Sequence, residues 1–177
     1  MKTNAVEQEF IRAYEQYVDA VFRHCVFRVS DREKAKDATQ LTFVRLWDSM
    51  SGGKEIENMR AFVYRIANNL IIDEYRKRKD VSLDRMRDDE GFDIGFDPRH
   101  VIEAKDEYAR AQALLECLPE KYRQALVMRH IDGLSVRDIA RLTHETENVI
   151  SVRIHRAIEK LQRLSTDAQA QQPYQNG

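Results

Sequence analysis

The chain has 177 residues, of which 33% are charged and 42% are apolar. This length suits one domain of ordinary size or two small ones. Only 6 Gly and 3 Pro are present, which argues against strand-and-turn architectures because these usually use more of both. The formal net charge of −1 excludes a basic signature over the whole chain, although it can hide local segregation of charge.

The sequence lacks the marks of a secreted, membrane or metal-binding protein. Its N-terminus, MKTNAVEQEF, has no apolar core of signal-peptide length. No window approaches the roughly 18 apolar residues of a membrane span. Cys25 and Cys117 form no CxxC pair, and His24 beside Cys25 has no zinc-like spacing. We therefore expect a soluble, cytoplasmic protein without a metal site or another cofactor.

Apolar spacing of three and four predicts three helices in the first half of the chain. The first covers residues 10–29. Ser30-Asp31 can cap a second helix from residue 32 to about residue 50, which Ser51-Gly52-Gly53 ends. The third should run from residue 57 to about residue 79. Its apolar residues lie on two faces, so we expect it to pack between two partners.

Composition changes after residue 79. Between residues 84 and 107 there are nine acidic residues against four basic ones, and Gly91, Gly95 and Pro98 interrupt any helix. We therefore predict a flexible acidic linker over residues 81–107. It would join an N-terminal domain of residues 1–80 to a C-terminal domain of residues 108–166. A polar, disordered tail should follow over residues 167–177.

Four helices are predicted in the C-terminal domain. They cover residues 108–117, a stretch that has Pro119 in its first turn and runs to about residue 131, and then residues 136–142 and 147–164. The fold class is therefore all-α, with an N-terminal helical bundle and a C-terminal domain of four helices.

The last two predicted helices follow the helix-turn-helix plan. Ser135 with Asp138 resembles a capping box shortened from Glu to Asp, and Thr146 can cap the longer helix. A short helix, a tight turn and a longer helix place the second helix in the major groove of DNA. The sequence therefore predicts a DNA-binding unit at this end of the chain.

One face of the helix over residues 147–164 has chemistry suited to DNA. Arg156 can donate to both acceptors of guanine, Asn148 can pair with adenine, and Val152 can touch a thymine methyl group. Side chains at the flanks suit phosphates. From this pattern alone, a solvated helix face is an equally good interpretation. The candidates are Asn148, Ser151, Val152, Arg153, His155 and Arg156.

Residues 118–164, LPEKYRQALVMRHIDGLSVRDIARLTHETENVISVRIHRAIEKLQRL, resemble the C-terminal DNA-binding region of sigma-70 family transcription initiation factors. KDATQLTFVRLWDSM, residues 36–50, independently resembles the family helix that docks on the polymerase clamp. NMRAFVYRIANNLIIDEYRKRK, residues 58–79, resembles the helix that opens and reads the downstream promoter element. Two motifs in the right order are more specific than either alone. With only these two domains, the chain looks like the extracytoplasmic-function (ECF) group.

The resemblance implies site residues in the first domain. Asn69 matches the family Asn that meets an extruded base, and its amide offers both a donor and an acceptor. Basic side chains along the same helix attract phosphates without regard to sequence. The downstream-element candidates are Asn58, Arg65, Asn69, Arg76, Lys77 and Arg78, and the polymerase-binding candidates are Asp37, Gln40 and Arg45.

Four residues, at three places in the chain, depart from the family pattern. Leu41 stands where an acid is usual, His144 stands where a turn Gly is common, and Asn148-Val149 replaces Gly-Thr. Because a non-Gly residue rarely takes a positive φ, we expect a locally different turn at His144. The changed start of the last helix suggests an unusual upstream promoter sequence.

The function implied by the resemblance is not enzymatic. The chain would bind core RNA polymerase and promoter DNA to direct transcription initiation, with no small-molecule substrate. ECF factors are commonly held by an anti-sigma factor, so one is expected here. The alternative is an autonomous helix-turn-helix regulator with an unrelated helical interaction domain, which would bind duplex DNA alone. The basic third helix and the docking-helix resemblance argue against this alternative.

Overall fold

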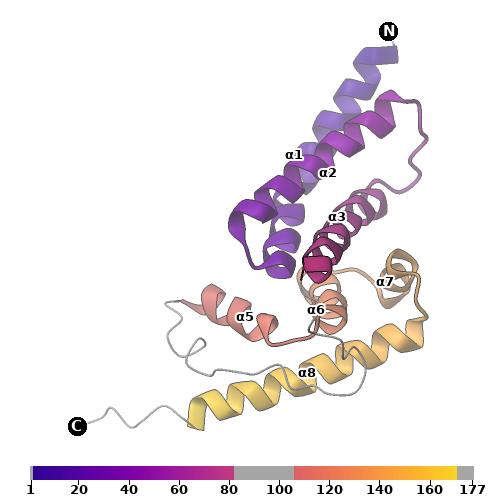
Figure 1. The fold of residues 1–177 in the computed structure, drawn as a ribbon. Coiled ribbons are helices and arrows are strands. Elements are labelled where there is room, and N and C mark those ends of the chain that lie inside the picture. Colours follow the sequence, from indigo (N-terminus) through magenta and orange to yellow (C-terminus); the bar gives the residue numbers. More distant parts are fainter. Residues whose placement is uncertain (1, 82–105, 171–177) are drawn as a thin grey trace. The chain divides into compact units, whose positions relative to one another are not determined.

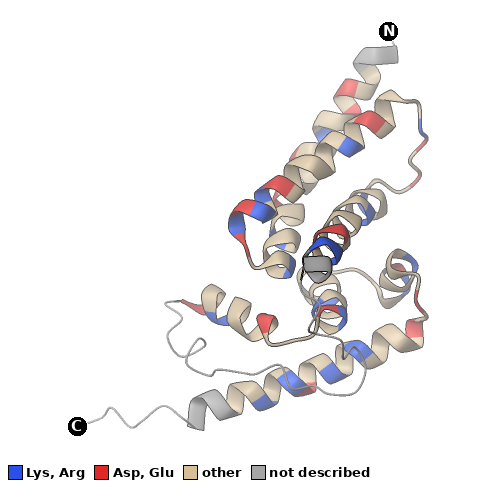
Figure 2. Cartoon of the chain, viewed as in Figure 1, with Lys and Arg blue, Asp and Glu red and all other residues tan. Residues whose placement is uncertain are grey.

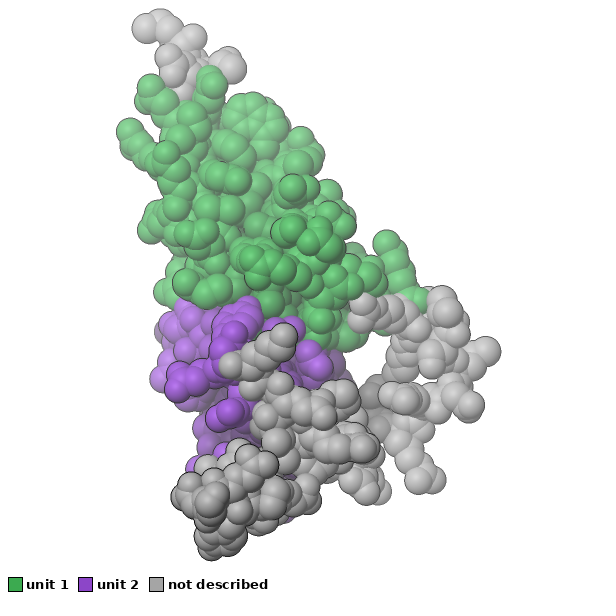
Figure 3. Space-filling model, turned by 90° about the vertical axis from the view of Figure 1, so that its left-hand side faces the viewer, with its two compact units in different colours: residues 1–86 green, residues 87–177 purple. Residues whose placement is uncertain are grey.

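The computed structural model describes the backbone of residues 2–81 and 106–170 (Figure 1), and the side chains of residues 5–77 and 106–166. All regular structure in these ranges is helical, in agreement with the all-α prediction. The chain divides into two compact units, residues 1–86 and 87–177 (Figure 3). The predicted linker over residues 81–107 lies almost wholly outside the described residues.

The described part of the first unit consists of three helices: α1 (Lys2–Val29), α2 (Arg32–Ser51) and α3 (Met59–Val81). Each helix packs against the other two, so α3 buries apolar side chains on two sides, as predicted. The centre of this unit is mainly apolar and closed to solvent. Side chains that are at most 1% exposed include Val21, Leu46, Val63 and Ile71.

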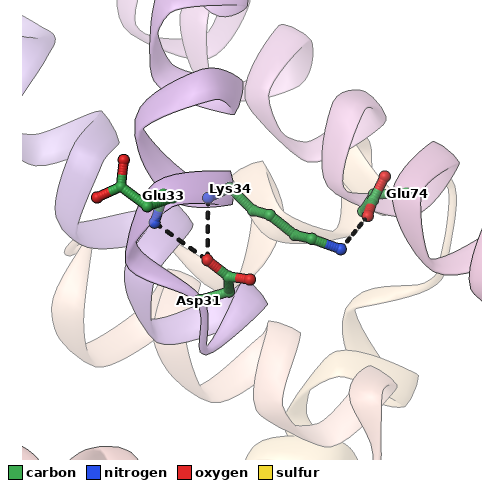
Figure 4. Close-up of polar contacts among 4 residues, drawn as sticks. All are labelled: Asp31, Glu33, Lys34 and Glu74. Carbon is green, nitrogen blue, oxygen red and sulfur yellow. Dashed lines mark hydrogen bonds and ion pairs between the residues drawn. The ribbon is translucent and has the colours of Figure 1, made fainter.

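Short polar side chains define where the helices of the first unit begin. Asp31 Oδ1 accepts hydrogen bonds from the backbone N–H groups of Glu33 and Lys34, at 3.0 and 3.1 Å (Figure 4). This cap starts α2 at the predicted residue. Asn58 Oδ1 accepts from the N–H of Ala61 at 2.9 Å, so α3 begins at Met59, two residues later than predicted.

The second unit contains α5 (Glu107–Glu116), α6 (Glu120–Leu126), the π-helical turn η1 (Val127–Ile131), α7 (Val136–Thr143) and α8 (Glu147–Ala170). The long helix α8 packs against α5, α6 and α7 and so organises the unit. Its core is also closed to solvent. Side chains that are at most 1% exposed include Leu118, Met128, Ile139 and Ile150.

In the second unit, two helices end at places that differ clearly from the sequence predictions. The helix predicted to run to about residue 131 becomes a π-helical turn after Leu126, because the N–H of Asp132 bonds to the carbonyl of Val127, five residues back, at 3.0 Å. The last helix continues to Ala170, beyond the predicted end at residue 164. It therefore includes the first four residues of the predicted tail, and the remainder of that tail lies outside the described residues.

Candidate nucleic-acid interface

The two faces predicted for the last helix are confirmed by burial. Ile150 and Ala157 of α8 are 1% and 0% exposed, and they lie on the side that meets α7 and the rest of the core. The opposite side is open to solvent and includes the apolar Val152 at 39% exposure. Basic residues recur along α8 (Figure 2). The exposed candidates are Asn148, Ser151, Val152, His155 and Arg156.

Capping residues set the start of both helices of the helix-turn-helix. The N–H of Asp138 donates to Ser135 Oγ at 3.1 Å, and this hydroxyl in turn donates to Asp138 Oδ2 at 2.6 Å. In a full capping box the acid would bond the backbone N–H of the cap residue, so the shortened box is only half formed. Thr146 Oγ1 accepts from the N–H of Val149 at 3.3 Å, and α8 starts at Glu147 as predicted.

The turn between α7 and α8 has a left-handed residue at its centre. His144 has φ 57° and ψ 37°, and the N–H of Glu145 bonds to the carbonyl of Ala140 at 3.0 Å. This is the conformation for which Gly is favoured at a helix C-terminus. The structure therefore does not bear out the expected local change in the turn: His144 adopts the left-handed conformation and bears its steric cost.

Arg153 differs from the other candidates on α8 because it is half-buried and paired within the protein. Its Nη2 atom lies 2.8 Å from Glu145 Oε1. Only 15% of its side chain is exposed, against 76% for His155. His155 Nε2 lies 3.5 Å from Glu159 Oε1. The guanidinium of Arg153 is thus already held by a carboxylate, which competes with the phosphate contact predicted for it.

The candidates predicted from the sequence did not include two basic residues of α7, the first helix of the helix-turn-helix. Arg137 and Arg141 are exposed on α7, and with His144 they line an open hollow of about 530 Å³ beside the turn. Their spacing of four residues places both on one face of a helix, so the sequence pattern could have revealed them. In helix-turn-helix proteins this first helix crosses the DNA backbone.

Adjacent asparagines of α3 face opposite ways. Asn68 is 1% exposed, and its Oδ1 accepts a hydrogen bond from Nη1 of the fully buried Arg28 at 3.1 Å. Asn69 is exposed, as its predicted DNA contact requires. Arg65 is exposed as well and lies over the ring of Phe62, with 4.9 Å from Cζ to the ring centroid.

The remaining downstream-element candidates divide into three kinds. Arg76 and Lys77 are exposed on α3. Asn58 is exposed, but its amide oxygen caps α3, so a DNA contact would have to use its NH₂ group or replace the cap. The side chain of Arg78 lies outside the described residues.

The polymerase-binding candidates of α2 share an exposed helix face with two apolar side chains. Asp37, Gln40 and Arg45 are all exposed. Leu41 and Val44 lie among them and are 42% and 54% exposed. Exposed apolar groups that cluster at the centre of a polar face mark a surface suited to a protein partner.

No cluster of three or more His, Cys, Asp or Glu residues that could hold a metal ion occurs among the described residues. Within the same ranges, no helix has the length and apolar character needed to cross a membrane. Cys117 is half-buried, and its Sγ donates to the carbonyl of Ala113 at 3.2 Å. Burial, and secondarily the carboxylate of Glu116, raises the pKa of the Cys117 thiol.

Comparison with known proteins gives two family matches. Residues 13–81 match the model of Sigma-70 region 2, and residues 108–161 match the model of Sigma-70, region 4. Together these matches cover more than half of the chain. The ECF RNA polymerase sigma factor SigW of Bacillus subtilis (strain 168) is 27% identical over an alignment of 170 residues, and the match covers 91% of each chain.

Two solved structures have a similar fold. RpoE, in its co-crystal structure with the anti-sigma factor NepR from Bartonella quintana, aligns with a TM-score of 0.71 and 21% identity, over 90% of this chain and 98% of that one. CnrH, in complex with the cytosolic domain of CnrY, aligns with a TM-score of 0.69 and 22% identity, over 94% and 95%. An autonomous helix-turn-helix regulator with an unrelated interaction domain would carry no region 2, so the match over residues 13–81 disfavours that alternative. The chain belongs to the sigma-70 family, in its ECF group, as an alternative sigma factor that directs promoter recognition.

Proposed function

We propose that the exposed face of α8 reads the upstream promoter element in duplex form. The observation that carries this assignment is the division of α8 into a buried side and a side that presents Asn148, Val152 and Arg156 to solvent. A bidentate contact from Arg156 to guanine would contribute about 1–3 kcal/mol of discrimination against the wrong base. Ser151 and His155 flank this surface, and Arg137 and Arg141 of α7 would contact phosphates.

The exposed face of α3 would engage the downstream element once its strands separate. Asn69 would bond the edge of an extruded base, since its amide is open to solvent while the neighbouring amide of Asn68 is held in the core. Arg65, Arg76 and Lys77 would attract the backbone of the displaced strand. Asn58 and Arg78 complete the set expected from the sequence.

Core RNA polymerase would bind the exposed face of α2, where Asp37, Gln40 and Arg45 surround Leu41 and Val44. The polymerase performs the chemistry, so the chain itself would be neither an enzyme nor a receptor for a small-molecule substrate. The chain would act in the cytoplasm, where RNA polymerase binds promoter DNA.

An anti-sigma factor is proposed as a further partner. RpoE of the solved complex is bound to the anti-sigma factor NepR, and CnrH is bound to the cytosolic domain of CnrY. This chain shares their fold over most of its length. The proposed domain limits, 1–80 and 108–166 with a linker over 81–107, would let the two domains reach separate promoter elements or close under an inhibitor.

In vitro transcription with core polymerase tests this division of labour. Arg156→Ala should weaken discrimination between a matched and a mutated upstream element by about 1–3 kcal/mol. Asn69→Ala should instead reduce promoter opening, read from permanganate reactivity of unpaired thymines, and leave polymerase binding intact. Unchanged promoter preference in the Arg156→Ala protein would remove the assignment of α8.

A further inference from the structure

An ion pair links the turn of the helix-turn-helix to its second helix. Glu145 directly follows His144, the left-handed residue that ends α7, and Arg153 lies almost two turns into α8. Arg153 Nη2 lies 2.8 Å from Glu145 Oε1. The pair therefore ties the turn to the body of the helix that presents Arg156.

Burial separates this pair from two other ion pairs of the described residues. The side chains of the pairs Lys34–Glu74 and Lys36–Glu33 are between 36% and 78% exposed, where water screens the attraction. Arg153 and Glu145 are 15% and 34% exposed. Removing the Glu145 carboxylate would leave the Arg153 guanidinium with little access to water and without this partner. The free-energy cost should exceed that of losing the partner of an exposed charge.

The negative charge of Glu145 should weaken DNA binding at this position. Its presence there is explained if the carboxylate orients the helix α8. A carboxylate beside a helix that reads DNA repels phosphates and lowers affinity. Arg156 stands only three residues after Arg153, so a rotation or shift of α8 that follows loss of the pair would misalign its guanidinium. A bidentate contact to guanine tolerates little misalignment because both N–H groups must point at fixed acceptors.

We propose that Glu145 is a positioning residue for promoter recognition and that it acts through Arg153 to set the orientation of α8. This inference rests on the proposed role of α8 in reading the upstream element. It assigns the Arg153 guanidinium to a contact within the domain, in place of the phosphate contact that the sequence pattern suggested.

The test uses the full chain bound to core polymerase, on promoters with a matched or a mutated upstream element, over a range of salt concentrations. Glu145→Gln and Arg153→Gln should each lower the discrimination between the two promoters by about fivefold or more. The double variant should be no worse than either single variant, because both remove one interaction. The slope of log affinity against log salt should stay at the value of the unmodified chain.

A phosphate contact by Arg153 predicts a different pattern, which would overturn the inference. Arg153→Gln would then lower the salt slope by about 1 and weaken both promoters alike, and Glu145→Gln would raise affinity for both. Glu159→Gln is the matched control, since it also removes one carboxylate, from an exposed position on α8, and it should preserve discrimination.

Two further variants keep the outcomes distinct. Glu145→Asp retains the charge with a shorter reach and serves if the Gln variants do not fold by circular dichroism; it should cause a smaller fall in discrimination. Arg156→Ala reports on the proposed function itself. If Arg156→Ala abolishes promoter preference while the variants at Glu145 leave it unchanged, only the positioning role fails. If Arg156→Ala has no effect, the assignment of α8 fails.

Discussion

Lys34 of α2 is bonded to Glu74 of α3, with 2.8 Å between Nζ and Oε1 (Figure 4). The backbone N–H of Lys34 is at the same time held by the carboxylate of Asp31, which caps α2. One residue therefore links the start of α2 to the last third of α3. Glu74 stands just before Arg76 and Lys77, so the link holds in place the helix end that is proposed to meet the downstream strand.

Lys34→Gln should lower the free energy of unfolding of the first unit by only about 0.2–1 kcal/mol, since both partners are partly exposed and screened by water. Urea unfolding followed by the fluorescence of Trp47, the one tryptophan of the chain, measures this unit. A double-mutant cycle with Glu74→Gln isolates the pair. Lys36→Gln, which affects a more exposed pair within α2, is the matched control. Strict additivity of the two changes would contradict the link.

The adjacent asparagines of α3 should separate stability from function. Asn68→Ala removes the hydrogen bond to the buried Arg28 and should cost about 1.5–3 kcal/mol, because bonds to charged groups lie in that range. Asn69→Ala changes an exposed side chain and should alter stability by less than about 0.5 kcal/mol.

Promoter opening should show the reverse order when it is compared at a temperature where both variants are folded. Asn69→Ala should be the more defective variant in permanganate footprinting, whereas Asn68→Ala should be close to the unmodified chain. Equal stability losses in the two variants would refute the division of α3 into a buried and an exposed amide.

The left-handed turn offers a stabilising substitution. His144→Gly should raise the free energy of unfolding of the second unit by about 0.5–1 kcal/mol. A side chain at positive φ costs about 1–2 kcal/mol, and the greater freedom of Gly in the unfolded chain offsets part of the gain from removing it. His144→Ala keeps a Cβ and should bring no such gain. Circular dichroism of the two variants checks the difference, and a gain with Ala equal to that with Gly would argue against backbone strain as the cause.

Local signals account for what the sequence could predict. The start of α2 follows from Asp31, and the start of α8 follows from Thr146, because a cap depends on residues only a few positions away. The buried and exposed sides of α8 follow from its helical period. These local features therefore predicted the helix-turn-helix and the exposure of most candidate residues on α8.

Features that depend on distant or irregular structure could not be predicted in this way. The hydrogen bond from Arg28 to Asn68 joins residues 40 positions apart. The pairing of Arg153 with Glu145 depends on the left-handed turn between α7 and α8, and the period of the chain gives no sign of the π-helical turn η1. The sequence therefore located the helix that is proposed to read DNA, but not the contact that holds Arg153.

Cys117 should react slowly with alkylating reagents in the folded chain. Burial and, to a smaller extent, the Glu116 carboxylate raise the pKa of its thiol, and the thiolate is the reactive form. As pH rises past the ordinary value for cysteine, the unfolded chain loses this proton first and binds fewer protons than the folded chain. Stability should therefore decrease with pH in that range.

Iodoacetamide labelling of the native and the urea-unfolded chain, resolved by mass spectrometry, measures the reactivity of this thiol. Cys117→Ser is the control that leaves Cys25 as the one remaining cysteine, and its stability should fall less steeply over the same alkaline range. Equally fast labelling of Cys117 in the native and unfolded chains would show that burial does not suppress the thiolate.

The exposed apolar pair of α2 should contribute to polymerase binding without contributing to the fold. Leu41 and Val44 are 42% and 54% exposed, so Leu41→Ser and Val44→Ser should change the free energy of unfolding by less than about 0.5 kcal/mol. Apolar side chains at the centre of a polar face lose more water on binding than the surrounding charges do. If they form the centre of the interface, each substitution should weaken binding to core polymerase by about 1 kcal/mol or more. The surrounding Asp37→Asn should mainly change the association rate and its salt dependence.

Competition against a labelled unmodified chain for a limiting amount of core polymerase measures these affinities, with salt varied in parallel. The apolar variants should lose affinity at every salt concentration, because hydrophobic burial is little affected by screening, whereas the Asp37 effect should fade as salt rises. Ile11→Ser, at a comparably exposed apolar position of α1, is the matched control and should bind normally. If Ile11→Ser is as damaging as Leu41→Ser, the apolar contact extends over α1 and is not confined to the α2 face; if none of the three matters, polymerase docks through the polar residues alone.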